Sequence, residues 1–484
     1  MKIFSLTIIF SFIASFICAQ GSDQIPTLAI TDVTVIDATG RDPQPSMTVL
    51  LSDDKICAIQ PVGRVKIPSG TRIVSGKGKY LIPGLWDMHV HISNSQIFIP
   101  LLIANGVTSV RQMTSNEKGF RRLKEMKSQI AAKKMIGPDI YLPVVVFGKD
   151  QQWDGIIQMN TQEDVAEVIG SVKEKDADFI KVFDLYDPAI FKSLLKEAKK
   201  QHISVAGHCP LAFNMGEIAM EGMDSFEHFF GVPLACSSEE ASIRQQLIQT
   251  AKEYNSSFDD IVRLLYWILT PEILNTYDPE KAQAFISILK KSDSYQCPTA
   301  ILWDGWSKLN DTLATSDYRL KYIPDSYLKT WLYLKDNPMS KKLSGEDFIF
   351  ARKIMEKYSE MLRLFCKAGI PMIAGTDVSL TNPYNFPGFG LHDELSLLVK
   401  AGLSSMQAIQ AATKNAATVL GVLDKTGTVE QGKCADLVLL NANPLDDINN
   451  TRKINAVFRA GSYLSGTDLN DMLQKEEKMA QAVK

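Results

Sequence analysis

The chain has 484 residues, of which 45% are hydrophobic and 22% are charged, and its formal net charge is -3 at neutral pH. This composition is typical of a globular protein with one large domain and a smaller one, and it excludes a long disordered chain. The near-neutral charge also excludes a strongly basic surface. We therefore expect a small-molecule substrate as partner and no nucleic acid, and we leave a homo-oligomer open.

The N-terminal residues have the pattern of a secretory signal peptide. Lys2 supplies a positive charge, residues 3–17 form a short apolar core, and Ala19 offers a small residue for cleavage. A transmembrane anchor is the alternative, but the apolar run is short and polar residues follow it at once. Lipidation at Cys18 is a minor alternative. The sequence predicts a signal peptide over residues 1–19, a periplasmic or secreted protein, and a mature chain without membrane insertion.

Both flanks of the remaining chain alternate apolar and polar residues. Residues 26–80 and 424–466 share this alternation and carry Gly, Pro and Asp at the expected turns. A period of two residues is typical of strands that are buried on one face. We therefore predict one small β-sandwich domain that is built from both chain ends.

The middle of the chain, residues 81–423, alternates short apolar runs with amphipathic helical patterns such as Glu117–Lys133, Gln162–Lys175 and Pro188–Lys200. Eight strand-helix units in sequence predict an α/β fold, a (β/α)8 TIM-like barrel, with its chemistry at the C-terminal ends of the strands. The predicted strands are Leu85–His91, Val107–Arg111, Ile140–Phe147, Phe179–Phe183, Ile203–His208, Asp224–His228, Tyr295–Leu302 and Ile370–Asp377.

A helical insert is predicted over residues 236–365, on both sides of the strand at Tyr295–Leu302. It is rich in aromatic residues, including Tyr266, Trp267, Trp303, Trp306 and Trp331. Core packing of the inserted helices is the simpler interpretation. Because insertions after late barrel strands lie over the active face, a lid is the alternative.

Histidines stand where the predicted strands end. His89 and His91 are two residues apart in the first strand and point to the same face, which suits a shared metal ion. His208 ends the fifth strand, His228 ends the sixth and Asp377 ends the eighth. Isolated histidines at strand ends could simply cap loops, but this ring of ligand types favours a metal site.

Lys181 lies in the middle of the fourth predicted strand, where burying an ammonium group is costly. It could pair with a buried carboxylate. We favour a second interpretation, in which burial lowers the pKa of the amine and the neutral amine takes up carbon dioxide. The resulting carbamate would be an anionic ligand that bridges two metal ions.

These segments resemble the metal-dependent amidohydrolase superfamily, and within it the imidazolonepropionase and prolidase-like group of binuclear type. The resemblance covers nearly all of the chain after residue 19. It rests on PGLWDMHVH, GVTSVR, DFIKVF, GHCP, SFEH and AGTD at the strands, and on the tail LHDELSLLVKAGLSSMQAIQAATKNAATVLG followed by GTVEQGKCADLVLLNANP.

The resemblance implies two metal ions and their ligands. One ion would be bound by His89, His91, Lys181 and Asp377, and the other by Lys181, His208 and His228. Asp377 would also be the catalytic residue that handles the proton. Two departures from the family pattern are Gln112, which replaces an acidic residue, and Cys-Pro-Leu-Ala after His208, which lacks the glutamate that deaminases use.

This residue set supports hydrolysis of an amide C–N bond in a small substrate, such as a dipeptide, by a hydroxide that bridges the metals. Zinc suits the imidazole-rich set best, with manganese, iron or cobalt as alternatives, and carboxylated Lys181 would be the bridging ligand. Other readings are hydrolysis of a lactam, cyclic imide or lactone, and a catalytically silent ligand-binding barrel. If Asp377 is not the base, His392 is the next candidate, although a loop or helix-start role suits His392 better.

Overall fold

The computed structural model describes residues 26–148, 154–183, 187–210, 213–229, 231–253, 270–308, 314–336 and 345–482. The predicted signal peptide at residues 1–19 lies outside the described residues, as do Tyr266 and Trp267 of the predicted insert. Within the described ranges, no helix combines the length and the apolar character needed to cross a membrane.

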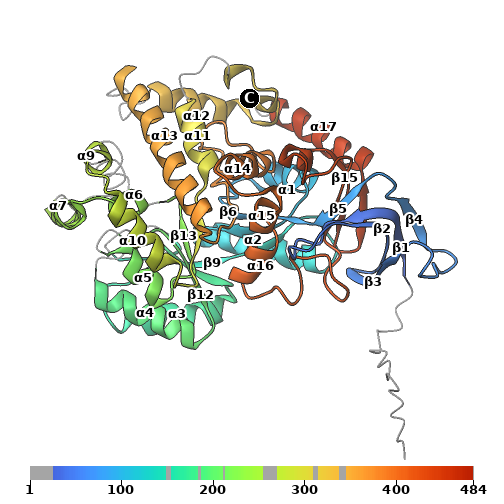
Figure 1. The fold of residues 1–484 in the computed structure, drawn as a ribbon, viewed down its shortest axis with the longest axis horizontal. Coiled ribbons are helices and arrows are strands. Elements are labelled where there is room, and N and C mark those ends of the chain that lie inside the picture. Colours follow the sequence, from blue (N-terminus) through green and yellow to red (C-terminus); the bar gives the residue numbers. More distant parts are fainter. Residues whose placement is uncertain are drawn as a thin grey trace, which may run out of the picture.

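Both chain ends build one eight-stranded sheet, called the terminal sheet below. Its order is β17-β16-β15-β5-β1-β2-β3, with β4 paired to β1. Figure 1 shows the strands from the two chain ends side by side at one end of the molecule, where β15 runs antiparallel to β5. All the paired strands belong to one sheet, so the two packed layers of the predicted β-sandwich stay a prediction. The strands are β1 (Leu28–Val35), β2 (Gln44–Ser52), β3 (Lys55–Pro61), β4 (Arg72–Ser75), β5 (Tyr80–Pro83), β15 (Leu437–Leu440), β16 (Ile454–Arg459) and β17 (Ser462–Ser465).

The middle of the chain forms two parallel sheets, which makes the fold α/β. One has the order β6-β7-β8 and the other the order β10-β9-β11-β12-β13-β14. Every strand pair within these two sheets is parallel. The strands are β6 (Leu85–Val90), β7 (Val107–Gln112), β8 (Asp139–Tyr141), β9 (Pro143–Phe147), β10 (Ile156–Gln158), β11 (Phe179–Val182), β12 (Ser204–Gly207), β13 (Ser225–Glu227) and β14 (Tyr295–Cys297).

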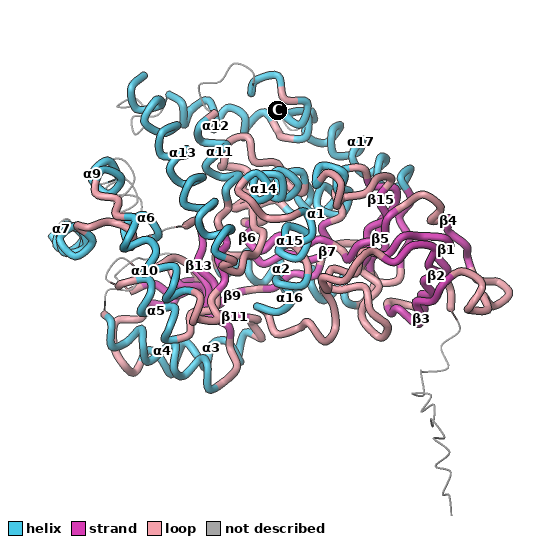
Figure 2. The backbone as a smooth tube through the Cα atoms, in the orientation of Figure 1, coloured by secondary structure: helices cyan, strands magenta, loops and turns pink. Residues whose placement is uncertain are grey.

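Helices connect the parallel strands and cover the sheets, as Figure 2 shows. Many begin at a side chain that caps the free backbone N–H groups; Asp187, for example, accepts from Ala189 N and Ile190 N at the start of α4. The helices are α1 (Ser95–Ala104), α2 (Glu117–Ala131), α3 (Asp164–Lys175), α4 (Pro188–Lys200), α5 (Met215–Glu221), α6 (Val232–Ala235), α7 (Glu240–Glu253), α9 (Thr270–Asn275), α10 (Pro279–Leu289), α11 (Ala300–Ser307), α12 (Asp325–Asp336), α13 (Gly345–Ala368), α14 (Phe389–Lys400), α15 (Ser405–Ala411), α16 (Lys414–Val419) and α17 (Gly466–Ala482).

Residues 370–378 run between the two parallel sheets. On one side, Ile373 N donates to Gln296 O of β14 at 2.9 Å, and on the other Met88 N of β6 donates to Ala374 O at 2.9 Å. The predicted strand Ile370–Asp377 is therefore replaced by two isolated parallel bridges, at Met372 and Val378. The segment still brings its end next to the end of β6.

Two further strand predictions need correction. The strand predicted at Tyr295–Leu302 ends at Cys297, and α11 begins at Ala300. The carboxylate of Glu394 accepts from Ile301 N at 2.8 Å, so a residue far along the chain satisfies the start of this helix. The strand predicted at Ile140–Phe147 is split in two at Leu142, whose N–H donates to Asp178 Oδ2 at 2.7 Å.

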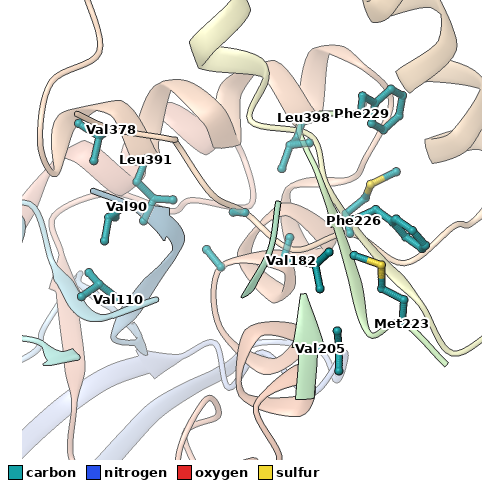
Figure 3. Packing of buried hydrophobic residues seen from close by; sticks show 14 of the residues in the cluster. Val90, Val110, Val182, Val205, Met223, Phe226, Phe229, Val378, Leu391 and Leu398 are labelled. Carbon is teal, nitrogen blue, oxygen red and sulfur yellow. The ribbon is translucent and has the colours of Figure 1, made fainter. Parts of the chain in front are cut away.

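The main hydrophobic core lies between the parallel strands and their helices. Figure 3 shows residues of this cluster from different elements, with Val90 near Val110 on one side and Val182 near Val205 and Phe226 on the other. Alternate residues of these strands are apolar and buried on the helix side, so the residues between them face the other way, where the polar residues of the next section gather. A separate cluster of buried hydrophobic side chains lies on the terminal sheet.

Candidate metal centre

The ligand types predicted from the sequence lie at the carboxyl ends of neighbouring parallel strands. Lys181 is in β11, opposite Ala206 of β12, and His208 follows β12 directly. Asp377 N donates to His89 O at 2.8 Å, which joins the eighth segment to β6. A Cβ on Gly375 would lie 2.5 Å from Cys297 Sγ and 2.9 Å from His89 Cβ, so glycine allows this close approach.

His89, His91 and Asp377 form one compact group. Asp377 Oδ1 lies 3.2 Å from His89 Nε2 and 2.8 Å from His91 Nε2. Among the described residues, these three side chains form one of two groups whose ligand atoms all lie within 4.8 Å of one another. The i, i+2 spacing therefore places both imidazoles against one carboxylate, as the sequence predicted.

His208 and His228 form the other half of the cluster. Their ring centroids are 5.1 Å apart, and the His228 ring is 4.4 Å from that of His89. His228 Nδ1 also lies 2.9 Å from Thr299 Oγ1. The structure thus gathers the four predicted histidines around one point, and each ring contacts at least one of the others.

Lys181 is completely buried, and its Nζ has no hydrogen-bond partner among the described residues. Burial lowers the pKa of Lys181 from 10.5 to about 8, although the charges of Glu227 and Asp377 oppose that change. Its Nζ lies 5.1 Å from the centroid of the Phe183 ring. An unpaired ammonium group in this position is costly, and a neutral amine is correspondingly easier to form.

Burial also decides the charge of the histidines. It lowers the pKa of His91, and it holds the pKa values of His208 and His228 well below their usual range, with nearby Lys181 and His89 adding to the effect. For Asp377, burial alone would raise the pKa, but the neighbouring imidazoles and their hydrogen bonds hold it well below its usual value. At neutral pH His91, His208 and His228 therefore offer neutral nitrogen lone pairs beside one carboxylate, which are donor types that zinc prefers.

The backbone is strained at the same place. His228 has a φ of 61°, Thr299 a φ of 45° and Asp377 a φ of 55°, in the left-handed region that residues with a side chain seldom adopt. Each of these residues either belongs to the cluster or bonds to it. Such strain persists only where the surrounding structure enforces it, and it is enriched at functional sites.

Sequence reasoning missed Glu227 and Arg111. Both are fully buried, and Arg111 Nη2 donates to Glu227 Oε1 at 2.7 Å, while Glu227 Oε2 lies 2.8 Å from His89 Nδ1. Burial alone would raise the pKa of Glu227, but Arg111 and His89 hold it well below its usual range. Glu227 could have been noticed in the sequence, because it is a charged residue inside the predicted strand Asp224–His228 and stands next to His228.

Further polar groups hold Asp377 and the eighth segment. Asn382 Nδ2 donates to Asp377 Oδ2 at 3.2 Å and to Asp377 O at 2.6 Å. Asp87 accepts from Thr376 N at 2.9 Å and from Thr376 Oγ1 at 2.7 Å. Asn382 therefore bonds directly to the carboxylate of Asp377, while Asp87 of β6 holds the preceding residue, Thr376.

Two residues that the sequence left uncertain have structural contacts. Gln112 accepts from Ile92 N at 2.8 Å and donates to Thr114 O, so it ties the loop after β6 to the loop after β7. His392 lies in α14, where Nδ1 is 2.9 Å from Thr451 Oγ1 and Nε2 is 3.0 Å from Asn105 O. Both ring nitrogens of His392 are thus engaged away from Asp377, which supports its helix-start interpretation.

Aromatic side chains border the cluster. The Phe183 ring meets the His208 ring edge to face at 5.1 Å. Trp303 of α11 donates from Nε1 to His228 O at 3.3 Å and stacks on Tyr358 of α13 at 5.2 Å. Part of the predicted helical insert therefore reaches the cluster, whereas Figure 1 shows α7 and α9 at the outer edge of the molecule.

Comparison with known proteins shows which family part of the chain is similar to. Residues 319–464 match the amidohydrolase family. An imidazolonepropionase from Thermoplasma volcanium is 36% identical over 109 residues, which cover 21% of this chain and 25% of that protein. The match thus spans about a quarter of the length of this curated relative.

Solved structures match over much more of the chain. A bottromycin amidohydrolase has a TM-score of 0.71 and 21% identity, with 95% of this chain and 91% of that chain covered. A Xaa-Pro dipeptidase has a TM-score of 0.62 and 18% identity, with 91% and 100% covered. These likenesses define the class of fold, an α/β protein with parallel sheets and an additional domain. Residues 319–464 thus match the amidohydrolase family, and the fold of the chain is similar to that of solved amidohydrolases.

Proposed function

We propose that the protein is a metal-dependent hydrolase that cleaves an amide C–N bond of a small substrate. One observation carries this proposal: His89 and His91 meet on a single oxygen of Asp377, beside a buried lysine that has no hydrogen-bond partner among the described residues. A binding module has no evident use for both features at once.

The side chains fit two divalent metal ions. His89, His91 and Asp377 would hold one ion, and His208 and His228 the other, with carboxylated Lys181 shared between them. Lys181 Nζ supports this assignment, because it is a buried polar atom that lacks a partner within the described part of the chain. His89 Nε2 supports it as well, because it lies 3.2 Å from the oxygen of Asp377 that the same ion would contact. Four imidazoles favour zinc over magnesium, and manganese, iron or cobalt would also suit.

When bound, the metal ions would generate hydroxide from water near neutral pH and polarise the scissile carbonyl. Asp377 would take the proton from the attacking water and deliver it to the leaving nitrogen. Its Oδ1 faces the histidines, while Asn382 donates to its Oδ2 and keeps the carboxylate in place. The chain thus supplies orientation and proton transfer.

The walls of the cluster suggest an apolar or cyclic group on the substrate. Phe183 borders His208 on one side and Trp303 borders His228 on the other. A dipeptide with proline or another bulky residue would place its side chain against such rings. A lactam, cyclic imide or lactone would react at the same residues.

We also propose the architecture that this activity would use. The bonds from residues 370–378 to β14 and β6 support a closed (β/α)8 barrel over residues 81–423. Residues 26–80 and 424–466 would form the accompanying β-sandwich, with the helical insert at residues 236–365. The signal-like residues 1–19 would direct the protein to the periplasm or the exterior.

Metal analysis and a substrate panel test the proposed function. The mature protein, supplied with zinc and bicarbonate, should contain close to two ions per chain and hydrolyse at least one member of a panel of dipeptides, N-acyl amino acids, lactams and lactones. No metal-dependent turnover of any panel member would favour a silent barrel. A value near one ion per chain would mean that Lys181 does not bridge two metal ions and has a structural role.

Lys181→Ala tests the bridging ligand. This variant should lose tight binding of the metal pair, and added short carboxylic acids should restore part of its activity by replacing the carbamate oxygens. Lys181→Arg should not be rescued, because a guanidinium group stays cationic and does not take up carbon dioxide. Full activity of Lys181→Ala without added acid would contradict the carbamate.

A further inference from the structure

A buried chain of hydrogen bonds leads from Arg111 to the candidate metal ligand His89. Arg111 Nη2 donates to Glu227 Oε1 at 2.7 Å, and Ser225 Oγ donates to the same oxygen at 2.7 Å. The other oxygen, Glu227 Oε2, lies 2.8 Å from His89 Nδ1. Arg111, Ser225 and Glu227 have no exposed surface, so water does not compete for these bonds.

Arg111 is itself fixed in place. Its Nε donates to Met88 O at 2.7 Å and its Nη1 donates to Ser225 Oγ at 2.9 Å. Met88 is the residue before His89, so the guanidinium group holds both the backbone beside His89 and the carboxylate that touches its ring. The planar guanidinium fork gives these bonds a defined direction.

These contacts determine which nitrogen of His89 carries the proton. Glu227 faces a permanently charged guanidinium group and a hydroxyl donor, and an ionised carboxylate can only accept hydrogen bonds. His89 Nδ1 must therefore be the donor in the 2.8 Å contact. Nε2 is then the ring nitrogen left for a metal ion, and it faces Asp377 Oδ1, the other candidate ligand atom, at 3.2 Å.

We propose that Glu227, held by Arg111, is a positioning residue that sets the Nδ1–H tautomer of His89 and thereby prepares Nε2 to bind a metal ion. This inference rests on the proposed metal centre and adds a role that the ligand set itself does not contain. Acidic or carbonyl partners of metal-binding histidines orient the ring and raise its basicity, and their loss typically costs about 10–100-fold in metal affinity.

An alternative use of the same residues is a third metal site. His89, Glu227 and Cys297 have ligand atoms within 4.8 Å of one another. However, both oxygens of Glu227 are already engaged, by Arg111 and Ser225 on one side and by His89 on the other. A metal cation there would stand beside a buried guanidinium group, so we assign Arg111 as the cation of this site.

Glu227→Gln provides the sharpest test. The single remaining side-chain oxygen would be taken by Arg111 and Ser225, which are both donors. The new NH2 group would then face His89 Nδ1 as a donor, and Nδ1 would have to accept. The proton would move to Nε2, which would remove the lone pair that the metal needs.

The tautomer can be read directly by ¹⁵N NMR of histidine-labelled, metal-free protein, because the chain has only six histidines and His89→Asn identifies the resonances of His89. We expect Nδ1–H in the wild type and Nε2–H in Glu227→Gln. In competition with a zinc chelator, Glu227→Gln should bind zinc about 10–100-fold more weakly. The matched control is Glu476→Gln, another buried glutamate, in α17, which should leave both readouts unchanged.

The outcomes separate this inference from the proposed function. Wild-type protein that binds no divalent ion would overturn the proposed function. Wild-type protein that binds zinc while Glu227→Gln binds it equally tightly would overturn the positioning role alone. If Glu227→Gln does not fold, the wild-type spectrum still decides, since an Nε2–H tautomer of His89 there would overturn the inference.

Discussion

Two buried cations show how differently the terminal sheet and the metal centre are built. Arg459, in β16, donates from Nη2 to Asp139 at 2.6 Å, from Nη1 to Asp436 at 3.0 Å and from Nε to Gly137 O at 2.8 Å. Lys181, in β11, is more deeply buried, yet its Nζ has no hydrogen-bond partner among the described residues. In the terminal sheet the buried cation is hydrogen-bonded to carboxylates, whereas in the centre the buried amine has no hydrogen-bonded anion among the described residues.

Burial of a charge alone therefore does not identify a functional site. Arg459 has the partners that a folded protein needs in order to hold a charge, so its role is to join the terminal sheet to the parallel sheets. Lys181 has only an aromatic ring and distant charges around it. The absence of compensation within the described residues is what points to a chemical change or a ligand.

The largest effect is expected from Asp377→Asn. Asparagine keeps the size of the side chain and an oxygen that can still contact a metal ion, but it does not accept a proton at neutral pH. Turnover of any substrate found in the panel should fall by about 10²–10⁴-fold, with the fold and the metal content retained. Steady-state kinetics beside elemental analysis checks this. Equal turnover in the variant would move the proton transfer to another residue.

A large loss of stability is expected from Arg459→Met. The substitution leaves the carboxylate of Asp436 buried without its cation, and breaking a buried pair in this way costs about 3–5 kcal/mol of unfolding free energy. Urea unfolding at neutral pH measures it. Lys192→Met, which removes one half of the exposed pair with Glu221, is the control and should have little effect. Similar losses in the two variants would mean that the buried pair contributes no more to stability than the exposed pair.

A gain in unfolding free energy, instead of a loss, is expected for Lys181→Met in metal-free, carbonate-free buffer. The pKa of Lys181 falls from 10.5 to about 8 on folding, which corresponds to roughly 3 kcal/mol of destabilisation below pH 8. Between about pH 8 and 10.5 the folded chain has lost a proton that the unfolded chain still binds, so wild-type stability should rise with pH.

Lys181→Met should therefore be more stable than the wild type at pH 7 and should lack this rise, because methionine has no charge to bury. Urea unfolding of both proteins at several pH values provides the comparison. A variant that is less stable than the wild type at pH 7 would show that Lys181 is compensated after all, in the same manner as Arg459.

The smallest effect is expected from Thr299→Val. The hydroxyl of Thr299 lies 2.9 Å from His228 Nδ1, and its removal leaves the orientation of that ring less restricted. Metal affinity should fall by about tenfold, near the lower limit for such outer partners. Thr299→Ser keeps the hydroxyl and is the control in a chelator competition. Identical affinities in the two variants would assign the orientation of His228 to its other contacts.

The α/β class was predictable from the sequence. So was the common location of His89, His91, Lys181, His208 and His228, because each stands at or near the end of an apolar strand and the strands are parallel. That rule depends only on local pattern and on the common direction of the strands. Whether these side chains bind metal stays a prediction that the experiments above test. The resemblance to amidohydrolases, which rested on the strand motifs and on the C-terminal motifs, is supported by the family match over residues 319–464 and by the curated relative.

The errors came from contacts between distant parts of the chain. Glu394 lies 93 residues after Ile301 and accepts a hydrogen bond from its N–H at the start of α11. This helix takes the place of the second half of the predicted strand Tyr295–Leu302. Glu227 and His89 are 138 residues apart, so no local pattern could show that one orients the other. Likewise, the eighth strand appears only as bonds to β14 and β6, which the apolar run at Ile370–Asp377 does not encode.

The pairing of β5 with β15 has a consequence for how the chain is made. Leu81 stands opposite Leu439, so 357 residues must be synthesised between the two partners. During vectorial synthesis, one edge of β5 has no strand to pair with until the last part of the chain emerges, and unpaired edges are prone to aggregate. Completion of the terminal sheet is then a late, non-local and slow event, which would make the newly made chain dependent on protection until its final strands are available.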